Sequence, residues 1–127
     1  MRILIVGPQD TLETLGAVLS KYGPFDEIKG AESGYLARGL AEEVKPQGVS
    51  WDGQLEDGLT CWNFAQLMLN MEQRPYMAYL DQTESRRNKA LCEEFGITEY
   101  LKAPVELNIL LEIVCTAGKK GQVRSDP

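Results

Sequence analysis

Short apolar runs alternate with amphipathic stretches along the whole 127-residue chain. Apolar or β-branched runs of this kind predict strands, here at 2–6, 25–29, 48–51, 75–80 and 97–101. The run at 2–6 is almost continuously apolar, which is typical of a strand buried on both faces. The run at 25–29 carries Asp26 and Glu27, so we expect it at an edge of the sheet.

Apolar residues recur at helical spacing after each strand and predict five helices. The inner faces are marked by Leu12, Leu15, Val18 and Leu19; Leu36, Leu40 and Val44; Phe64, Leu67, Met68 and Met71; Leu91 and Phe95 within 81–95; and Leu107, Leu110, Leu111 and Val114. Asp10 is expected to cap the first helix, with Glu13 completing a capping box. Alternating strands and helices predict an α/β fold, a three-layer sandwich around a parallel sheet.

The last ten residues, 118–127, show no such periodicity and are expected to form a disordered tail or a linker stub, which leaves 1–117 as one domain. The formal net charge of −6 argues against nucleic acid or an anionic membrane as the main partner. No run approaches the ~20 apolar residues of a membrane span, and the N-terminal apolar run is too short for a signal peptide. A cytoplasmic protein is the expectation.

The chain contains no histidine, which excludes histidine-ligated zinc, Ser-His or Cys-His nucleophiles and a phosphohistidine carrier. Its three cysteines, Cys61, Cys92 and Cys115, are widely spaced and form no C-x-x-C motif. Structural thiols in a reducing compartment are the simplest interpretation.

In a parallel sheet, binding sites lie at the carboxyl ends of the strands, which here are the residues after Val6, Trp51, Leu80 and Leu101. A dinucleotide site needs G-x-G-x-x-G after the first strand, but Gly7 stands alone there. A P-loop motif is also absent. We therefore expect no bound cofactor.

The strand ends resemble the receiver domain of bacterial response regulators over about residues 1–117. The resemblance rests on Asp52 at the end of the third strand with a D-G sequence following it, Pro75 at the start of the fourth strand, and the F-G-x-x-x-Y-L-x-x-P stretch at 95–104. It implies a flavodoxin-like sheet with strand order 2-1-3-4-5. It also implies that Asp52 corresponds to the aspartate that accepts a phosphoryl group from a histidine kinase.

In that family an acidic pair after the first strand holds Mg²⁺ together with the phosphoacceptor and a backbone carbonyl, which would be that of Gln54. A Thr or Ser ending the fourth strand and a Lys before the proline, here Pro104, contact the phosphoryl oxygens. The ion and the lysine neutralise the charge that develops on phosphorus.

This sequence departs from the family pattern at most of those positions. The acidic pair falls on Gly7 and Pro8, the hydroxyl on Leu80, the following small residue on Asp81, and the lysine on Ala103. Lys102 is adjacent to the lysine position, but a shift of one residue along a strand turns a side chain to the other face. Mg²⁺ would be held weakly at most, and the expected fold is that of a pseudo-receiver without phosphoryl chemistry.

Such a domain is expected to be non-enzymatic and to act by protein–protein contact, with a signalling partner, an attached output domain, or a second copy through the face of helix four, strand five and helix five. Candidate contact residues on that face are Arg86, Arg87, Lys89 and Tyr100. Tyr100 is expected to have lost its family partner, because Leu80 carries no hydroxyl. Two alternatives remain open: a phosphorylatable receiver that uses Asp52, and a flavodoxin-like domain that binds a small ligand at the strand ends.

Overall fold

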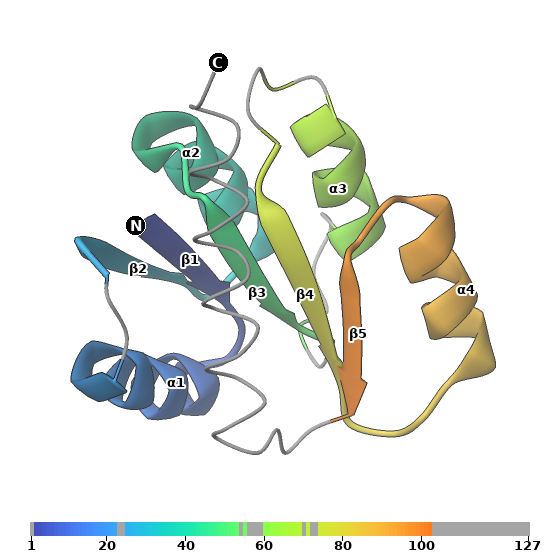
Figure 1. Cartoon of the computed structure of the whole chain (residues 1–127), viewed down its shortest axis with the longest axis horizontal. Helices are drawn as coiled ribbons and strands as arrows, with labels where there is room; N and C mark the ends of the chain where they lie inside the picture. The colour runs from blue at the N-terminus through green and yellow to red at the C-terminus, as the bar shows by residue number, and fades with distance from the viewer. Residues whose placement is uncertain are drawn as a thin grey trace.

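A five-stranded parallel sheet forms the centre of the protein in a computed structural model, which describes residues 2–22, 25–53, 55, 60–69, 71 and 74–102. Its strands are β1 (Arg2–Val6), β2 (Glu27–Ala31), β3 (Gly48–Asp52), β4 (Tyr76–Asp81) and β5 (Glu99–Lys102). They lie in the order β2-β1-β3-β4-β5, as Figure 1 shows. The α/β fold class, the strand order and the edge position of β2 are confirmed.

Helices flank the sheet on both faces. The described residues contain α1 (Gln9–Tyr22), α2 (Gly34–Val44), α3 (Cys61–Leu69) and α4 (Arg86–Glu94). The fifth predicted helix and the domain boundary at 117 lie outside the described residues. Within the described part of the chain, no helix is both long enough and apolar enough to cross a bilayer.

Two hydrophobic clusters hold the layers together, one on each face of the sheet. The larger includes Trp51 of β3, Phe64 of α3 and Cys92 of α4, and the smaller packs Ile3 and Ile5 of β1 against Leu19 of α1. Because β1 contributes to both clusters, its side chains are apolar at almost every position. This explains the continuous apolar run at the start of the sequence.

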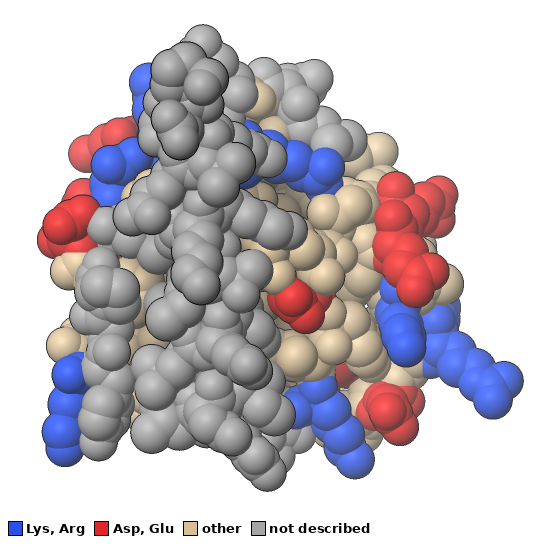
Figure 2. Space-filling view, in the orientation of Figure 1, with Lys and Arg blue, Asp and Glu red and all other residues tan. Residues whose placement is uncertain are grey.

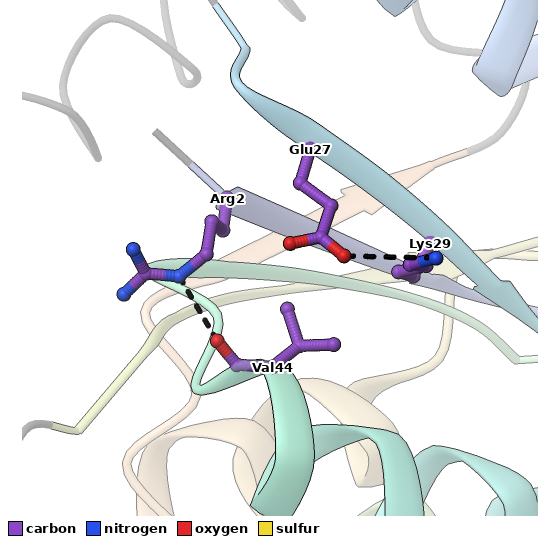
Figure 3. A network of polar contacts seen from close by, with 4 residues as sticks. All are labelled: Arg2, Glu27, Lys29 and Val44. Carbon is purple, nitrogen blue, oxygen red and sulfur yellow. Dashed lines mark hydrogen bonds and ion pairs between the residues drawn. The ribbon is translucent and has the colours of Figure 1, made fainter.

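The first strand is tied to the end of a helix by an arginine. The Nε of Arg2 donates to the Val44 carbonyl at 2.9 Å (Figure 3), and its Nη2 donates to the Lys45 carbonyl at 3.1 Å. A guanidinium at this place satisfies carbonyls that α2 leaves unpaired and complements its dipole. On the edge strand β2, the Lys29 Nζ lies 3.6 Å from the Glu27 Oε1 (Figure 3). An exposed ion pair of this kind contributes little to the stability of the fold.

Two strands begin two residues later than predicted. At β2, pairing with β1 runs from Arg2 opposite Glu27 to Val6 opposite Ala31, so the strand extends to the buried Ala31. Before β5, the amide of Ile97 donates to the Cys92 carbonyl at 2.8 Å. This bond closes the end of α4, so residue 97 belongs to the helix-to-strand turn.

The start of α1 also differs from the prediction. The helix begins at Gln9, and the Leu12 amide donates to the Pro8 carbonyl at 3.1 Å. Asp10 therefore lies in the first turn, where its charge favours the helix dipole, and does not cap the helix. The Glu13 carboxylate accepts from the Gln9 side chain at 3.1 Å, so the expected capping box is wrong.

The fourth helix is shorter than the predicted 81–95 segment. Ser85 is its N-cap, and the Ser85 Oγ accepts from the Asn88 amide at 3.1 Å. Asp81 belongs to β4. In α2, Leu36 is 57% exposed, because the helix packs through small residues, namely Gly34, Ala37 and Ala41.

Candidate functional site

Asp52 ends β3 at the carboxyl edge of the sheet, as the sequence predicted. The residue is only 3% exposed. The Thr11 hydroxyl, on the first turn of α1, donates to the Asp52 Oδ2 at 2.6 Å. One oxygen of the carboxylate is therefore already bound to a neighbouring side chain, and the group is shielded from solvent.

Two glycines allow the surrounding backbone to pack closely around Asp52. A Cβ on Gly7 would lie 2.8 Å from the Asp52 Cβ. A Cβ on Gly53 would lie 2.6 Å from the Tyr79 Oη and 2.9 Å from the Leu80 carbonyl oxygen, to which the Gly53 amide donates at 2.7 Å. Any larger side chain at either position must displace its neighbours. The loop after β1 thus leaves no room for an acidic residue at position 7 without rearrangement.

The described residues do not fit a Mg²⁺ ion at this edge. Gly7 and Pro8 carry no carboxylate, and Asp10 is exposed on α1. Among the residues that the structure describes, no group of three or more His, Cys, Asp or Glu is arranged to hold a metal. Gln54 lies outside the described residues. Mg²⁺ in proteins keeps several waters and is held by one or two carboxylates together with phosphate oxygens, and beside the described β1 loop only Asp52 offers a carboxylate, with one oxygen already bonded to Thr11.

The end of β4 carries a polar network that the sequence did not reveal. Leu80 is buried and apolar, whereas the next residue, Asp81, is 7% exposed. The Asp81 Oδ2 accepts from the Tyr100 hydroxyl at 2.7 Å and from the Asn88 Nδ2 at 3.1 Å. The Tyr100 hydroxyl also accepts from the Ser85 amide at 2.8 Å. Tyr100 therefore bonds to Asp81, a partner that the sequence did not indicate, in place of the hydroxyl that Leu80 lacks.

Both tyrosines beside this network are held in their neutral form. Burial and the hydrogen bond to Asp81 raise the pKa of the Tyr100 phenol above its ordinary value. Burial, and to a smaller extent the negative charge of Asp81, raises the pKa of the Tyr79 phenol as well. A neutral phenol keeps its proton to donate, which the bond from Tyr100 to Asp81 requires.

Aromatic rings connect the neighbourhood of Asp52 with the edge of the sheet. Tyr79 stacks on Trp62 of α3 at a centroid distance of 5.1 Å and on Tyr100 of β5 at 6.2 Å. The planes of Tyr79 and Tyr100 differ by 12°. Since the Tyr79 hydroxyl packs on Gly53, this row of rings runs from the residue after Asp52 to the network around Asp81.

Basic side chains surround a surface pocket of about 480 Å³ between α4 and β5. Its walls are formed by Glu84, Ser85, Arg86, Lys89, Tyr100 and Lys102. Figure 2 shows Lys and Arg side chains at the lower right of the molecule, over the start of α4 and below the end of β5, with an acidic side chain nearby. Lys102 thus takes part in this pocket together with residues of α4. Ala103 and Pro104 lie outside the described residues.

The α4 residues singled out from the sequence do not all share the pocket. Arg86, Arg87 and Lys89 are exposed on α4, and Arg87 is not part of the pocket wall. The free thiols Cys61 and Cys92 are buried in the core. Burial raises the pKa of both, that of Cys92 to about 11 with help from Asp81 and Glu93. Protonated, buried thiols of this kind pack as small apolar groups.

Sequence reasoning missed Thr11, Ser85, Asn88 and Tyr79. Ser85 could have been recognised, because a serine before a helical stretch is a frequent N-cap. Thr11 and Asp52 are 41 residues apart, and no local pattern indicates that they meet.

No protein-family model and no curated protein matches this sequence. Solved structures do match. The N-terminal domain of an uncharacterized protein from Wolinella succinogenes is 20% identical with a TM-score of 0.85, and 98% of each chain is covered. The signal receiver domain of a putative Luxo repressor protein from Vibrio parahaemolyticus is 19% identical with a TM-score of 0.84, covering 98% of this chain and 94% of that one.

A DNA-binding response regulator of the LuxR family from Staphylococcus aureus is 15% identical with a TM-score of 0.81. The alignment covers 91% of this chain and 97% of that one. At these identities the likeness shows the fold. The chain has the receiver fold that the motif at 95–104 led us to expect.

Proposed function

We propose that this chain is a receiver-like signalling domain that acts by protein–protein contact and does not take up a phosphoryl group at Asp52 by the Mg²⁺-dependent route. The observation that carries the proposal is the state of Asp52, which is 3% exposed with its Oδ2 bonded to the Thr11 hydroxyl. Transfer to this carboxylate would need an approach from solvent and cations to neutralise the developing charge. Gly7 and Pro8 provide neither a carboxylate nor a cation.

The other positions around Asp52 support the same conclusion. Leu80 has no hydroxyl to bind a phosphoryl oxygen, and the Asp81 carboxylate is engaged by Tyr100 and Asn88. Lys102 lines the pocket beside α4. A domain with this arrangement is a pseudo-receiver, a signalling module without enzymatic activity of its own.

The proposed mode of action is contact through the face that contains α4 and β5. Exposed cations on α4 and the partly exposed Tyr100 supply that face with side chains that bind proteins. Its occupant is a signalling partner, an output domain joined to the same chain, or a second copy. The structural relative from Staphylococcus aureus is described as a DNA-binding response regulator, which is consistent with an output domain.

The deciding experiment is incubation of the protein with acetyl phosphate or phosphoramidate in millimolar Mg²⁺, followed by intact-mass spectrometry. We expect no increase by the mass of a phosphoryl group, while a receiver that has its full acidic pair is labelled under the same conditions. Asp52→Asn is the matched variant. An adduct that appears on the natural chain and disappears in Asp52→Asn would establish the alternative, a phosphorylatable receiver.

Tryptophan fluorescence gives a second measurement of the same site. Trp51 precedes Asp52 and is 1% exposed, and the substitution Trp62→Phe leaves it as the single tryptophan of the chain. We expect no saturable change in its emission as Mg²⁺ is raised to millimolar concentration. Saturable quenching that is lost in Asp52→Asn would show that the ion binds.

A further inference from the structure

The pocket between α4 and β5 has a charge opposite to that of the protein as a whole. Among the residues that the structure describes, its wall contains three cations, Arg86, Lys89 and Lys102, and one anion, Glu84. The local charge is therefore +2, in a chain whose net charge is −6. Cations grouped at a concave site raise the local concentration of anionic groups.

We propose that this pocket docks a short acidic segment of a protein partner, whose carboxylates pair with Arg86, Lys89 and Lys102. The inference rests on the proposed function, contact signalling through this face, and adds the chemistry of the partner. A volume of about 480 Å³ lies within the range of ~300–1,000 Å³ that is typical of ligand pockets. A few side chains of an extended segment fit such a space.

The donors that the pocket offers are mainly charged side chains. Two backbone amides at the start of α4 already have acceptors, since the Ser85 amide donates to Tyr100 and the Asn88 amide donates to the Ser85 Oγ. A cradle of free amides is the usual basis for phosphate binding at a helix start. Flexible lysines and the fork of Arg86 instead suit carboxylates carried on different side chains.

One wall of the pocket is held in place before any partner arrives. The Tyr100 hydroxyl is fixed by Asp81 and by the Ser85 amide, and its ring stacks on Tyr79. A wall that is already ordered lowers the entropy cost of binding. The ring also gives the pocket an apolar surface, so we expect a segment in which acidic residues flank an aliphatic one.

A long polyanion fits the molecule less well than a short acidic segment. A nucleic acid would follow its backbone beyond the pocket onto a body whose overall charge is negative. Sequence-independent nucleic-acid binding draws most of its strength from many such backbone contacts. A short segment places its charges on the basic pocket alone.

The test uses the full chain and a fluorescein-labelled peptide of four glutamates around two leucines, followed by fluorescence anisotropy. We expect saturable binding that weakens as salt is raised and that is lost when glutamine replaces glutamate in the peptide. Each single substitution, Arg86→Gln, Lys89→Gln or Lys102→Gln, should weaken binding by about fivefold or less, and the triple variant by about 20-fold or more.

A charge-matched variant separates the pocket from general electrostatics. The triple substitution Lys29→Gln, Arg38→Gln and Lys45→Gln removes the same charge from exposed positions that lie outside both the pocket wall and α4. We expect it to weaken binding by about twofold or less. Equal losses in the two triple variants, or equal binding of the glutamine peptide, would overturn the proposal.

Two competitors identify other anions. If inorganic phosphate displaces the peptide at micromolar concentration, the pocket is a site for small anions. If a single-stranded oligonucleotide binds more tightly than the peptide, the pocket belongs to a nucleic-acid-binding surface. Either result rejects an acidic protein segment. The phosphorylation experiment on Asp52 is independent, so a phosphorylated chain that still binds the peptide would refute the proposed function alone.

Discussion

The bond between Tyr100 and Asp81 provides the sharpest test of the structure. The substitution Tyr100→Phe removes one oxygen and leaves the ring in place. That oxygen donates to the Asp81 Oδ2 at 2.7 Å and accepts from the Ser85 amide at 2.8 Å. Asp81 is a buried residue, 7% exposed, so water replaces the lost donor poorly.

The expected loss follows from these two bonds. A hydrogen bond to a charged group contributes about 1.5–3 kcal/mol, and most of the cost of its removal comes from leaving the buried carboxylate with one donor fewer. The Ser85 amide is only partly buried, so water can reach it and its share is small. We expect Tyr100→Phe to lower the free energy of unfolding by about 2–3 kcal/mol, which is a fall in Tm of about 6–10 °C for a domain of this size.

The assay is urea and thermal denaturation at pH 7, with Tyr35→Phe as the matched control. Tyr35 is 60% exposed, and its substitution should change the free energy of unfolding by less than about 0.5 kcal/mol. A double-mutant cycle of Tyr100→Phe with Asp81→Ala should give a coupling energy of about 1.5–3 kcal/mol, because the cycle cancels the desolvation of the carboxylate. A coupling energy near zero would refute the bond, whatever the two single losses were.

Two further predictions concern the same edge of the sheet. Gly53→Ala should lower the free energy of unfolding by about 1–3 kcal/mol in urea denaturation, because the added Cβ would lie 2.6 Å from the Tyr79 Oη. The control Gly39→Ala, whose Cβ would meet no atom within 4 Å, should raise the free energy of unfolding by about 0.5–1 kcal/mol. Equal effects of the two substitutions would contradict the close packing around Gly53. Burial and Asp81 raise the pKa of Tyr100, so the unfolded chain loses this proton before the folded chain does as the pH rises above about 10. The free energy of unfolding should therefore fall above this pH, and it should fall less in Tyr100→Phe. Identical pH profiles of stability for the two proteins would contradict the raised pKa.

The fold could be predicted from the sequence because the apolar pattern reports burial directly. A strand with both faces covered, such as β1, must be apolar throughout, and its partner helices must each present one apolar side. The ends of the elements were less predictable. Ile97 has the composition of a strand residue, yet its amide closes α4, and Asp10 looks like a cap although the helix begins before it.

The site was predictable only where its residues follow a strand directly. Asp52 was located because it ends an apolar run, and Leu80 and Asp81 were identified by their position at the end of β4. What these residues contact depends on chain segments brought together by the fold. The bonds from Thr11 to Asp52 and from Tyr100 to Asp81 join residues 41 and 19 positions apart, and neither periodicity nor turn chemistry records such pairs.

The row of rings suggests why this edge of the sheet should keep one arrangement. The contacts of Tyr79 with Gly53 and Tyr100 form a route by which a change near Asp52 reaches the pocket, and that route requires Tyr100 to move. Movement of Tyr100 breaks its bond to Asp81. If the bond contributes about 1.5–3 kcal/mol, a conformation that lacks it and has otherwise the same free energy is about tenfold to a hundredfold less populated. A ligand shifts such an equilibrium only through a difference in affinity between the two states. The pocket wall is thus biased toward its present form by a carboxylate within the chain itself, so a partner that prefers this form binds without waiting for an event at Asp52.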